Sequence, residues 1–172
     1  MRILRHLLSI LILPFTMVVV IPRWLYTTRG SADALWHGAA LAGVARVGGA
    51  LLFAAGFALF AWCVSLFARV GRGTLAPWDP TQRLVVVGPY RHVRNPMISG
   101  VLAMIAGEAL FLCSRAIAWW LATFWIINVV YFILLEEPGL VDRFGGDYRR
   151  YKAAVPRWIP RRTPWPADGQ LP

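Results

Sequence analysis

The sequence is poor in acidic residues and in charge altogether. Asp and Glu number 8 against 18 Lys and Arg, and charged residues make up 15% of a chain that is 58% hydrophobic. This composition excludes an ordinary soluble domain and predicts a membrane protein. The net charge of +10 does not form one basic face, because the basic residues lie between and after apolar segments. We therefore expect no nucleic acid partner.

Cysteine is also scarce, and its two positions, Cys63 and Cys113, both lie inside apolar runs. Neither residue belongs to a CxxC motif or has a histidine nearby, so the sequence predicts no metal site. We expect both to be small, buried hydrophobic residues.

Long apolar runs are abundant instead. Four of them approach the 20 or so helical residues that a hydrocarbon core of about 30 Å requires. They extend from Leu4 to Pro22, from Ala42 to Val70, from Pro96 to Ser114 and from Ala116 to Leu135. The first resembles a secretory signal, but the cleavage-like triplet at 32–34 lies too far beyond its apolar core. We therefore expect an uncleaved first helix.

The predicted fold class is all-α, a polytopic membrane bundle of about four transmembrane helices with an interfacial C-terminal helix. The whole chain, 1–172, is expected to form one membrane domain. Within it, residues 1–70 form a first helical hairpin, and residues 88–161 form a second hairpin with its tail.

The distribution of basic residues predicts the orientation in the membrane. Of the 18 basic residues, only Arg23, Arg29, Arg46 and Arg115 fall on one side of the predicted spans. The others place the N-terminus, the central loop and the C-terminal tail in the cytoplasm. Because only Arg115 clearly separates the third and fourth spans, those helices are expected to be antiparallel neighbours joined by a tight turn. That turn brings the central loop and the tail to the same membrane face.

Small residues in the second and third spans are spaced so that two helix backbones can approach closely. They are Ala45, Gly49 and Gly56 in the second span, and Gly100, Ala103 and Gly107 in the third. Glu108 lies in the middle of the third span, where an ionisable group is costly. It is expected to be protonated or bonded to Asn128, in a structural role.

The stretch GPYRHVRNPMISG, from Gly88 to Gly100, precedes and opens the third span. Asn95 suits a helix N-cap and Pro96 suits the first helical position. The free N–H groups that follow would point to the cytoplasmic interface and, with Arg94, favour an anion such as a carboxylate. An ordinary helix start is the alternative interpretation. His92 is expected to be an exposed loop histidine.

Glu136 and Glu137 are expected to end the fourth span as it leaves the membrane. A carboxylate pair at a helix C-terminus opposes the helix dipole and calls for a cation. Adjacent helical side chains point about 100° apart, so we expect one glutamate to face a ligand and the other an arginine of the basic tail. A solvated helix end with ordinary salt bridges is the alternative.

Beyond this pair, Gly145 and Gly146 predict a turn, and Asp147 is expected to cap a short helix. Tyr148 and Tyr151 share one side of that helix with Val155, while its basic residues lie elsewhere. This pattern is typical of an interfacial helix lying on the membrane. The tryptophans expected at the same depth are Trp158 and Trp165.

Taken in order, these motifs match a known pattern. The order G-x-Y-x-x-x-R-[HN]-P-x-x-x-G, a hydrophobic hairpin, E-E-P-x-L-x-x-x-F-G-x-x-Y-x-x-Y and V-P-R-W-I-P resembles the isoprenylcysteine carboxyl methyltransferase and phospholipid methyltransferase superfamily. The resemblance covers about Gly88 to Arg161. It implies an integral membrane enzyme that binds S-adenosylmethionine at the cytoplasmic side and receives a lipophilic acceptor from the bilayer.

The resemblance also implies roles for individual residues, with Arg94 and Glu137 expected to act in catalysis. The expected cofactor-binding residues are Tyr90, His92, Arg94, Asn95, Pro96, Gly100, Glu136, Glu137, Tyr148 and Tyr151. His92 is a weak candidate for a general base. Two positions depart from the family pattern, since members often have His at position 95 and Tyr at position 98, where this chain has Asn95 and Ile98.

The expected function is methyl transfer from S-adenosylmethionine to a lipophilic acceptor, either an isoprenylcysteine carboxylate or a phospholipid amine. The expected partners are the lipid bilayer and that acceptor, and the oligomeric state stays open. One alternative is a membrane reductase of the steroid-reductase type with a nicotinamide cofactor. The other is a non-catalytic membrane protein of the same architecture.

Overall fold

The structure, a computed structural model, describes residues 11–29, 34–35, 39–71 and 84–166. These residues form four continuous helices, and their only strand-like pairing is an isolated bridge between Ala34 and Ser114. The expected all-α architecture is confirmed. Residues 4–10 of the predicted first span lie outside the described residues, as does most of the triplet at 32–34.

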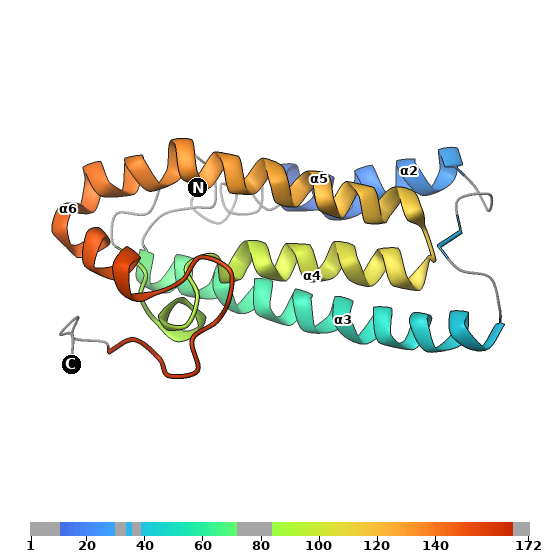
Figure 1. Ribbon diagram of the computed structural model, residues 1–172, viewed down its shortest axis with the longest axis horizontal. Coiled ribbons are helices and arrows are strands. Elements are labelled where there is room, and N and C mark those ends of the chain that lie inside the picture. The colour runs from blue at the N-terminus through green and yellow to red at the C-terminus, as the bar shows by residue number, and fades with distance from the viewer. Residues whose placement is uncertain (1–10, 30–33, 36–38, 72–83, 167–172) are drawn as a thin grey trace.

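Several helical segments follow one another without a break. The first helix joins η1 (Leu11–Val20) to α2 (Ile21–Arg29), and the second joins α3 (Ala39–Leu66) to η3 (Phe67–Gly71). A short turn, η4 (Gly88–Arg91), precedes α4 (Pro96–Phe111). The last helix joins α5 (Arg115–Tyr131), η5 (Phe132–Glu136) and α6 (Glu137–Ala154). Figure 1 shows α4 between α3 and the α5–α6 helix, with α2 beside α5.

Within the part of the chain that the structure describes, two helices are long and apolar enough to cross a membrane, Ala40–Val70 and Arg115–Ala154. Only 17% of the apolar window of each is buried, which fits a lipid-facing helix better than the core helix of a soluble protein. α4 is also apolar, but its 16 residues span only about 24 Å at about 1.5 Å per residue. The protein therefore combines two long apolar helices with a shorter one packed between them.

Two helix ends differ from those expected. The first helix continues past Pro22 to Arg29, where Thr27 and Thr28 remain helical by donating their hydroxyls to the carbonyl oxygen of Trp24. The third helix ends at Phe111, because the residues after it form the turn into α5. Its shorter length moves Glu108 from the middle of the helix to the last turn.

Pairs of glycines set the separation of α3 and α4, which form the most extensive helix contact. A Cβ on Gly49 would lie 2.6 Å from the carbonyl oxygen of Gly107, and one on Gly56 would lie 2.7 Å from that of Gly100. Only hydrogen fits at such distances, so the predicted close approach of the helix backbones is confirmed. The remaining small residues of the predicted set are Ala103, which also meets Gly56, and Ala45, which is half-buried.

The turn between α4 and α5 is as tight as predicted and consists of residues 112–114. Cys113 adopts a φ of 51°, the left-handed conformation that ends many helices and normally favours glycine. Ser114 caps α5 by accepting a hydrogen bond from the amide of Ile117. The two helices are therefore held side by side at this end. Cys63 is buried as expected, whereas Cys113 is only half-buried because it lies in this turn.

The helix of the fourth span does not end at Glu136 and Glu137 as expected, because it runs through both residues into α6. Pro138 removes the N–H that would bond to the carbonyl of Leu134, and the helix widens into a π-helical turn, η5, just before it. A π-turn adds a residue to the helix and rotates everything that follows it. Glu137 thereby becomes the first residue of α6 and turns inward.

Gly145 breaks α6 into two parts, as the Gly-Gly prediction indicated. Its φ of 53° and ψ of −125° are accessible to glycine and strained for other residues. Beyond the kink, Tyr148 and Tyr151 pack with Val155 and Trp165 in a buried cluster. The apolar side of this helix therefore faces the protein. Asp147 accepts a hydrogen bond from Arg150 through its side chain and caps no N–H.

Candidate functional site

The C-terminal strap, residues 155–166, crosses the segment 88–94 that leads into α4. Three backbone hydrogen bonds of 2.9 Å fix this crossing: Arg94 donates to Pro156, Arg161 to His92, and Trp165 to Arg91. The side chain of Arg91 adds a bond to the carbonyl of Trp165. The two polar motifs of the sequence therefore meet at one end of the bundle, as the tight turn predicted.

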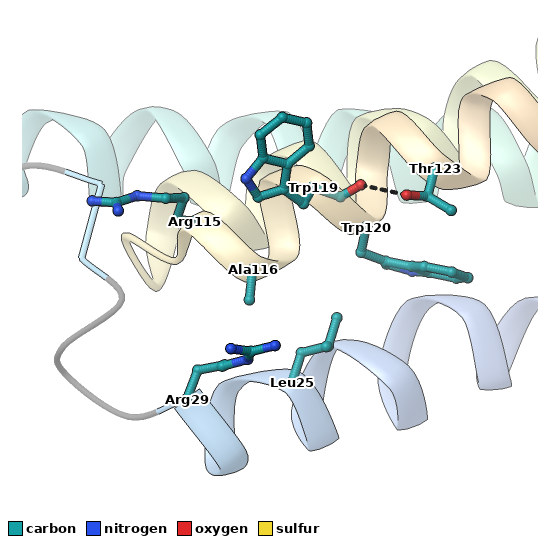
Figure 2. A pocket seen from close by; sticks show the side chains of 7 residues that line it. All are labelled: Leu25, Arg29, Arg115, Ala116, Trp119, Trp120 and Thr123. Atoms are coloured by element: carbon teal, nitrogen blue, oxygen red, sulfur yellow. Dashed lines mark hydrogen bonds between the residues drawn. The ribbon is translucent and has the colours of Figure 1, made fainter.

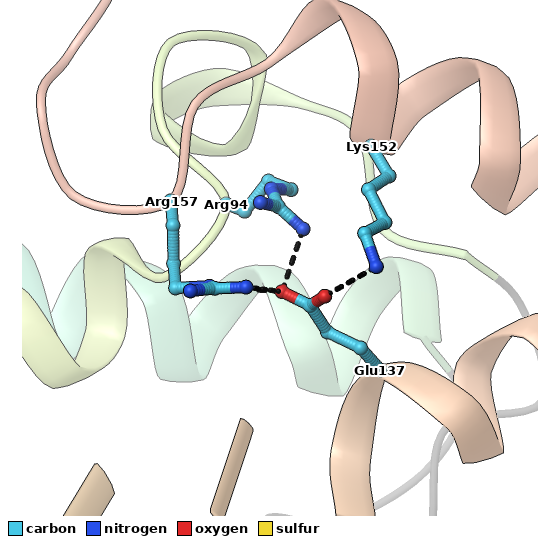
Figure 3. Close-up of polar contacts among 4 residues, drawn as sticks. All are labelled: Arg94, Glu137, Lys152 and Arg157. Carbon is cyan, nitrogen blue, oxygen red and sulfur yellow. Dashed lines mark hydrogen bonds and ion pairs between the residues drawn. The ribbon is translucent and has the colours of Figure 1, made fainter. Parts of the chain in front are cut away.

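A cluster of three cations around the carboxylate of Glu137 lies at this meeting point (Figure 3). Arg94 Nη1 is 2.8 Å from Glu137 Oε1, Arg157 Nη2 is 2.7 Å from the same oxygen, and Lys152 Nζ is 2.6 Å from Oε2. Arg157 Nε adds a further bond of 2.9 Å. The side chains of Glu137 and Arg94 are 6% and 10% exposed, so their pairing takes place away from water.

This cluster has more positive charge than the glutamate can neutralise. Glu137 accepts bonds on both oxygens, which leaves its carboxylate little capacity for a ligand. One carboxylate against three cations leaves an excess of two positive charges. The Nε of Arg94 is buried and has no hydrogen-bond partner among the described residues. The arrangement is therefore suited to receive an anion beside Arg94.

Glu136 differs from its neighbour although both residues are acidic and adjacent. It is half-buried and makes no ion pair or hydrogen bond with any residue that the structure describes. Glu137 contacts Arg157 of the tail, as expected for one member of the pair. Glu136 is thus the carboxylate left available for a ligand.

The start of α4 follows the sequence pattern with one difference. Pro96 is the first helical residue and Asn95 occupies the N-cap position, but the Asn95 side chain makes no capping bond. Its backbone carbonyl instead accepts bonds of 3.0 Å from both the amide and the hydroxyl of Ser99. The expectation of a side-chain cap is therefore wrong. The backbone supports the turn because Ser99 can donate twice to the same carbonyl oxygen.

Three tyrosines connect the segment 88–94 to α6 and the strap. The hydroxyl of Tyr151 donates to the carbonyl oxygen of Tyr90 at 2.7 Å. The ring of Tyr90 packs 5.5 Å from that of Phe67, and burial, followed by the nearby Cys63 thiol, raises the pKa of Tyr90 well above its usual range. Tyr148 is buried beside Tyr151. These side chains mainly build the scaffold of the site.

His92 is half-buried, which corrects the expectation of an exposed loop residue. Its Nδ1 lies 2.8 Å from the carbonyl oxygen of Arg161. A carbonyl oxygen only accepts hydrogen bonds, so Nδ1 carries a proton and Nε2 is the nitrogen that remains able to accept one. The histidine therefore holds the strap and retains one basic atom.

Other residues singled out in the sequence lie away from the cluster. Gly100 meets α3 at Gly56, and Ile98 packs against the main hydrophobic core. Glu108 has a buried oxygen without a partner among the described residues, and Asn128 bonds to the carbonyl of Phe124 in its own helix. The expected Glu108–Asn128 bond is therefore wrong.

Lys152 and Arg157 were not singled out as site residues, although the structure places both on Glu137. The expected need for a cation beside the glutamates was the available signal. That signal could not identify which basic residue of the tail would pair with the glutamate. Among the described residues, the structure brings together no group of His, Cys, Asp or Glu that could hold a metal ion.

Comparison with known proteins assigns the chain to a family. The model of the phospholipid methyltransferase family matches residues 44–147, which is more than half of the chain. No curated protein and no solved structure matches the chain. Of the two branches suggested by the sequence motifs, the phospholipid methyltransferase branch is the one matched. The chain therefore belongs to the phospholipid methyltransferase family, whose members use S-adenosylmethionine.

Proposed function

We propose that this protein transfers a methyl group from S-adenosylmethionine to a lipophilic, membrane-embedded acceptor, and that it binds the cofactor beside Arg94, Glu136 and Glu137. The observation that carries the proposal is the cluster in which three cations surround Glu137, while Glu136 makes no ion pair with any residue that the structure describes. This cluster joins the two motifs that suggested the family, and it lies at one end of the apolar bundle.

The residues present fit the charged groups of the cofactor. Its carboxylate suits the unpaired Nε of Arg94 and the two excess positive charges, since a charged acceptor strengthens such bonds. Its ammonium group or a ribose hydroxyl suits Glu136. When bound, S-adenosylmethionine supplies an electrophilic methyl group on a sulfonium.

Glu137 has a different role in this proposal from that of Glu136. Its oxygens are occupied by Arg94, Lys152 and Arg157, so it orients these cations and holds the strap against the segment before α4. Arg94 then contacts the cofactor, and Glu137 acts through Arg94. Positioning of this kind supplies much of the catalysis in a displacement at carbon, where the acceptor atom must be held about 3 to 3.5 Å from the methyl group.

Deprotonation of an amine acceptor requires a base near the same end of the bundle. His92 Nε2 is the candidate, since Nδ1 is committed to the carbonyl of Arg161. The hydrogen bond at Nδ1 also orients the ring. His92 would therefore combine a structural bond with proton acceptance at its second nitrogen.

An apolar groove supports a lipophilic acceptor. A cavity of about 500 Å³ opens between α3, α4 and α5, and its walls are alanines and leucines with Trp125. A phospholipid amine is the acceptor we propose, because the matching family is the phospholipid branch. An isoprenylcysteine carboxylate is the second candidate, and the motifs after Gly88 favour it equally.

In this proposal all four helices cross the membrane, with α4 enclosed by its neighbours and thinning the bilayer locally because of its length. The Arg94 end then faces the cytoplasm, as the distribution of arginines indicates. Cysteines introduced at Arg149 and at Arg46 would report this orientation. We expect a membrane-impermeant thiol reagent to label only the first from the cytoplasmic side.

Titration calorimetry in detergent tests the cofactor site. We expect saturable binding of S-adenosylmethionine, weakened by about 1.5 to 3 kcal/mol, or roughly 10- to 100-fold, in Arg94→Gln and in Glu136→Gln. Asp142→Asn is the matched control, because Asp142 is an exposed acid of the same helix. Unchanged titration curves for both site variants would refute the assignment. Saturable nicotinamide binding without S-adenosylmethionine binding would favour a reductase, and no affinity for either would favour a non-catalytic protein.

Transfer of a labelled methyl group identifies the acceptor. Membranes containing the protein are incubated with methyl-labelled S-adenosylmethionine and then separated into lipid and protein fractions. Label in an amine-bearing phospholipid supports the proposed acceptor, and label in prenylated protein supports the second candidate. Arg94→Gln membranes serve as the background control.

A further inference from the structure

A second concentration of positive charge lies at the opposite end of the bundle from Glu137. A cavity of about 470 Å³ opens there between α2 and α5. Figure 2 shows the guanidinium of Arg29 lying between the two helices, below Ala116 and beside Leu25, while Arg115 extends from the start of α5. Trp119, Trp120 and Thr123 complete the lining. The cavity therefore combines two cationic groups with apolar walls.

The cationic groups of this cavity are poorly neutralised. Arg29 makes no hydrogen bond or ion pair in the part of the chain that the structure describes, and Arg115 makes one bond of 3.1 Å to the carbonyl of Ala34. An arginine has five N–H donors, so most of the donors here remain available. None of the described residues that line the cavity is acidic. The charge of the cavity is thus complementary to an anion.

The walls of the cavity are held in place by bonds of their own. Trp120 donates its indole N–H to the carbonyl of Met17 at 3.0 Å, which ties α5 to η1. Thr123 donates to the carbonyl of Trp119 at 2.9 Å. These bonds hold the walls beside the two arginines in place.

The depth of the cavity indicates the source of the anion. From Arg115 to Leu135 the helix measures about 31 Å at about 1.5 Å per residue, which matches the thickness of a hydrocarbon core. If Leu135 marks one membrane surface, Arg115 and Arg29 lie at the level of the lipid headgroups on the other. Tryptophan is also enriched at that depth. Phospholipid phosphates are therefore the anions most concentrated at this cavity.

We propose that Arg29 binds the phosphate of an anionic phospholipid from the leaflet opposite the methyl-transfer site, and that Arg115, which lines the same cavity, strengthens this binding through its charge. The acyl chains of that lipid run down beside Leu25 and Trp120. This site is separate from the cofactor cluster, and its lipid is a bound partner that is not methylated there. It joins α2 to α5, two helices that otherwise meet through a limited contact.

Native mass spectrometry of the detergent-purified protein tests this site with phosphatidylglycerol as the probe. We expect one phosphatidylglycerol retained per protein, with at least a five-fold lower bound fraction in Arg29→Gln and a further loss in the Arg29→Gln/Arg115→Gln variant. Arg29→Lys retains most of the binding because it keeps the charge. Arg46→Gln is the matched control. Arg46 is an exposed arginine near the start of α3, and it does not line the cavity.

Three outcomes would overturn the proposal. One is an equal loss, or no loss, of lipid in Arg29→Gln and Arg46→Gln. Another is displacement of the lipid by millimolar inorganic phosphate, which would indicate a free-phosphate site. The third is equal retention of phosphatidylcholine. Thermal unfolding and S-adenosylmethionine titration of each variant show that the fold and the cofactor site are intact, so a failure here is distinguishable from a failure of the proposed function.

Discussion

The hydroxyl of Tyr151 donates a hydrogen bond of 2.7 Å to the carbonyl oxygen of Tyr90, and the two residues are 61 positions apart. Both are buried. The bond joins the segment before α4 to the second half of α6, so a residue of each polar motif supports the other. The site is therefore built by contacts between the motifs as well as by the membrane helices.

Tyr151→Phe tests the strength of this connection. The change keeps the ring and leaves the carbonyl of Tyr90 buried without a donor, which costs about 1 to 3 kcal/mol. In a chain of this size we expect the unfolding temperature in detergent to fall by about 2 to 4 °C per kcal/mol. The exposed Tyr26→Phe is the control and is expected to change nothing. Equal unfolding temperatures for the two variants would show that the bond contributes little.

Glu137→Gln tests the organising role of the buried carboxylate. The variant leaves Arg94, Lys152 and Arg157 without their counter-charge, and we expect a loss of about 3 kcal/mol. This is the low end for a buried pair, because Lys152 is 44% exposed and screened by water. Circular dichroism during thermal unfolding measures the loss. Asp147→Asn, which breaks an exposed pair with Arg150, should have almost no effect, and a similar loss there would contradict the assignment.

Gly107→Ala tests the glycine contact between α3 and α4. The new Cβ would lie 2.6 Å from the carbonyl oxygen of Gly49, so the helices must move apart at a cost of about 1 to 3 kcal/mol. Gly48→Ala is a close control, because a Cβ on Gly48 meets nothing within 4 Å. We expect thermal unfolding in detergent to be lowered only by the first change. An equal loss in Gly48→Ala would show that the close contact of the helices is not the cause, since alanine favours a helix more than glycine does.

Cys113→Gly is expected to stabilise the protein. Cys113 has a φ of 51°, and a side chain in this conformation costs about 1 kcal/mol or more that glycine avoids. Part of the gain is lost because glycine is more flexible in the unfolded chain. Cys113→Ala separates the effect of the backbone from that of the thiol. A rise in unfolding temperature for Gly and none for Ala is the expected pattern, and a rise for both would assign the effect to the thiol.

Because Tyr90 is buried, we expect the folded protein to lose stability at alkaline pH. Burial raises the pKa of Tyr90 in the folded protein, whereas the unfolded tyrosine ionises near pH 10. Above about pH 10 the unfolded chain therefore binds fewer protons than the folded one, and stability falls as pH rises. Tyr90→Phe should show a shallower fall between pH 9 and 11 in chemical unfolding. Parallel curves for the two proteins would indicate that Tyr90 is not the group responsible.

The fold and the meeting of the two motifs could be predicted because they depend on local and additive properties. Apolar length indicated the helices, and the short turn around Cys113 and Ser114 required antiparallel neighbours. Glycine spacing indicated the contact between Gly49 and Gly107. None of these features requires knowing which two side chains contact each other across a long separation in sequence.

The detailed site depended on properties that sequence patterns do not contain. The helix did not end at its first polar residues, Glu136 and Glu137. The π-turn before Pro138 instead changed the direction in which Glu137 points. Lys152 and Arg157 could not be separated from other basic residues until the kink at Gly145 fixed the path of the strap. Asn95 had the right residue type for a cap, but its side chain makes no capping bond.

The turn at residues 112–114 also restricts how the protein can open. Ser114 caps α5, and its own amide donates across the turn to the carbonyl of Ala109 in α4, so the two helices are held together at that end. The two helices can therefore move apart most at the ends that lie far from this turn. Arg94 lies just before the far end of α4, and Glu137 lies just beyond η5, at the far end of the other helix. Widening of the bundle to admit a large lipid would stretch this ion pair, together with the bonds that join α6 and the strap to the segment 88–94.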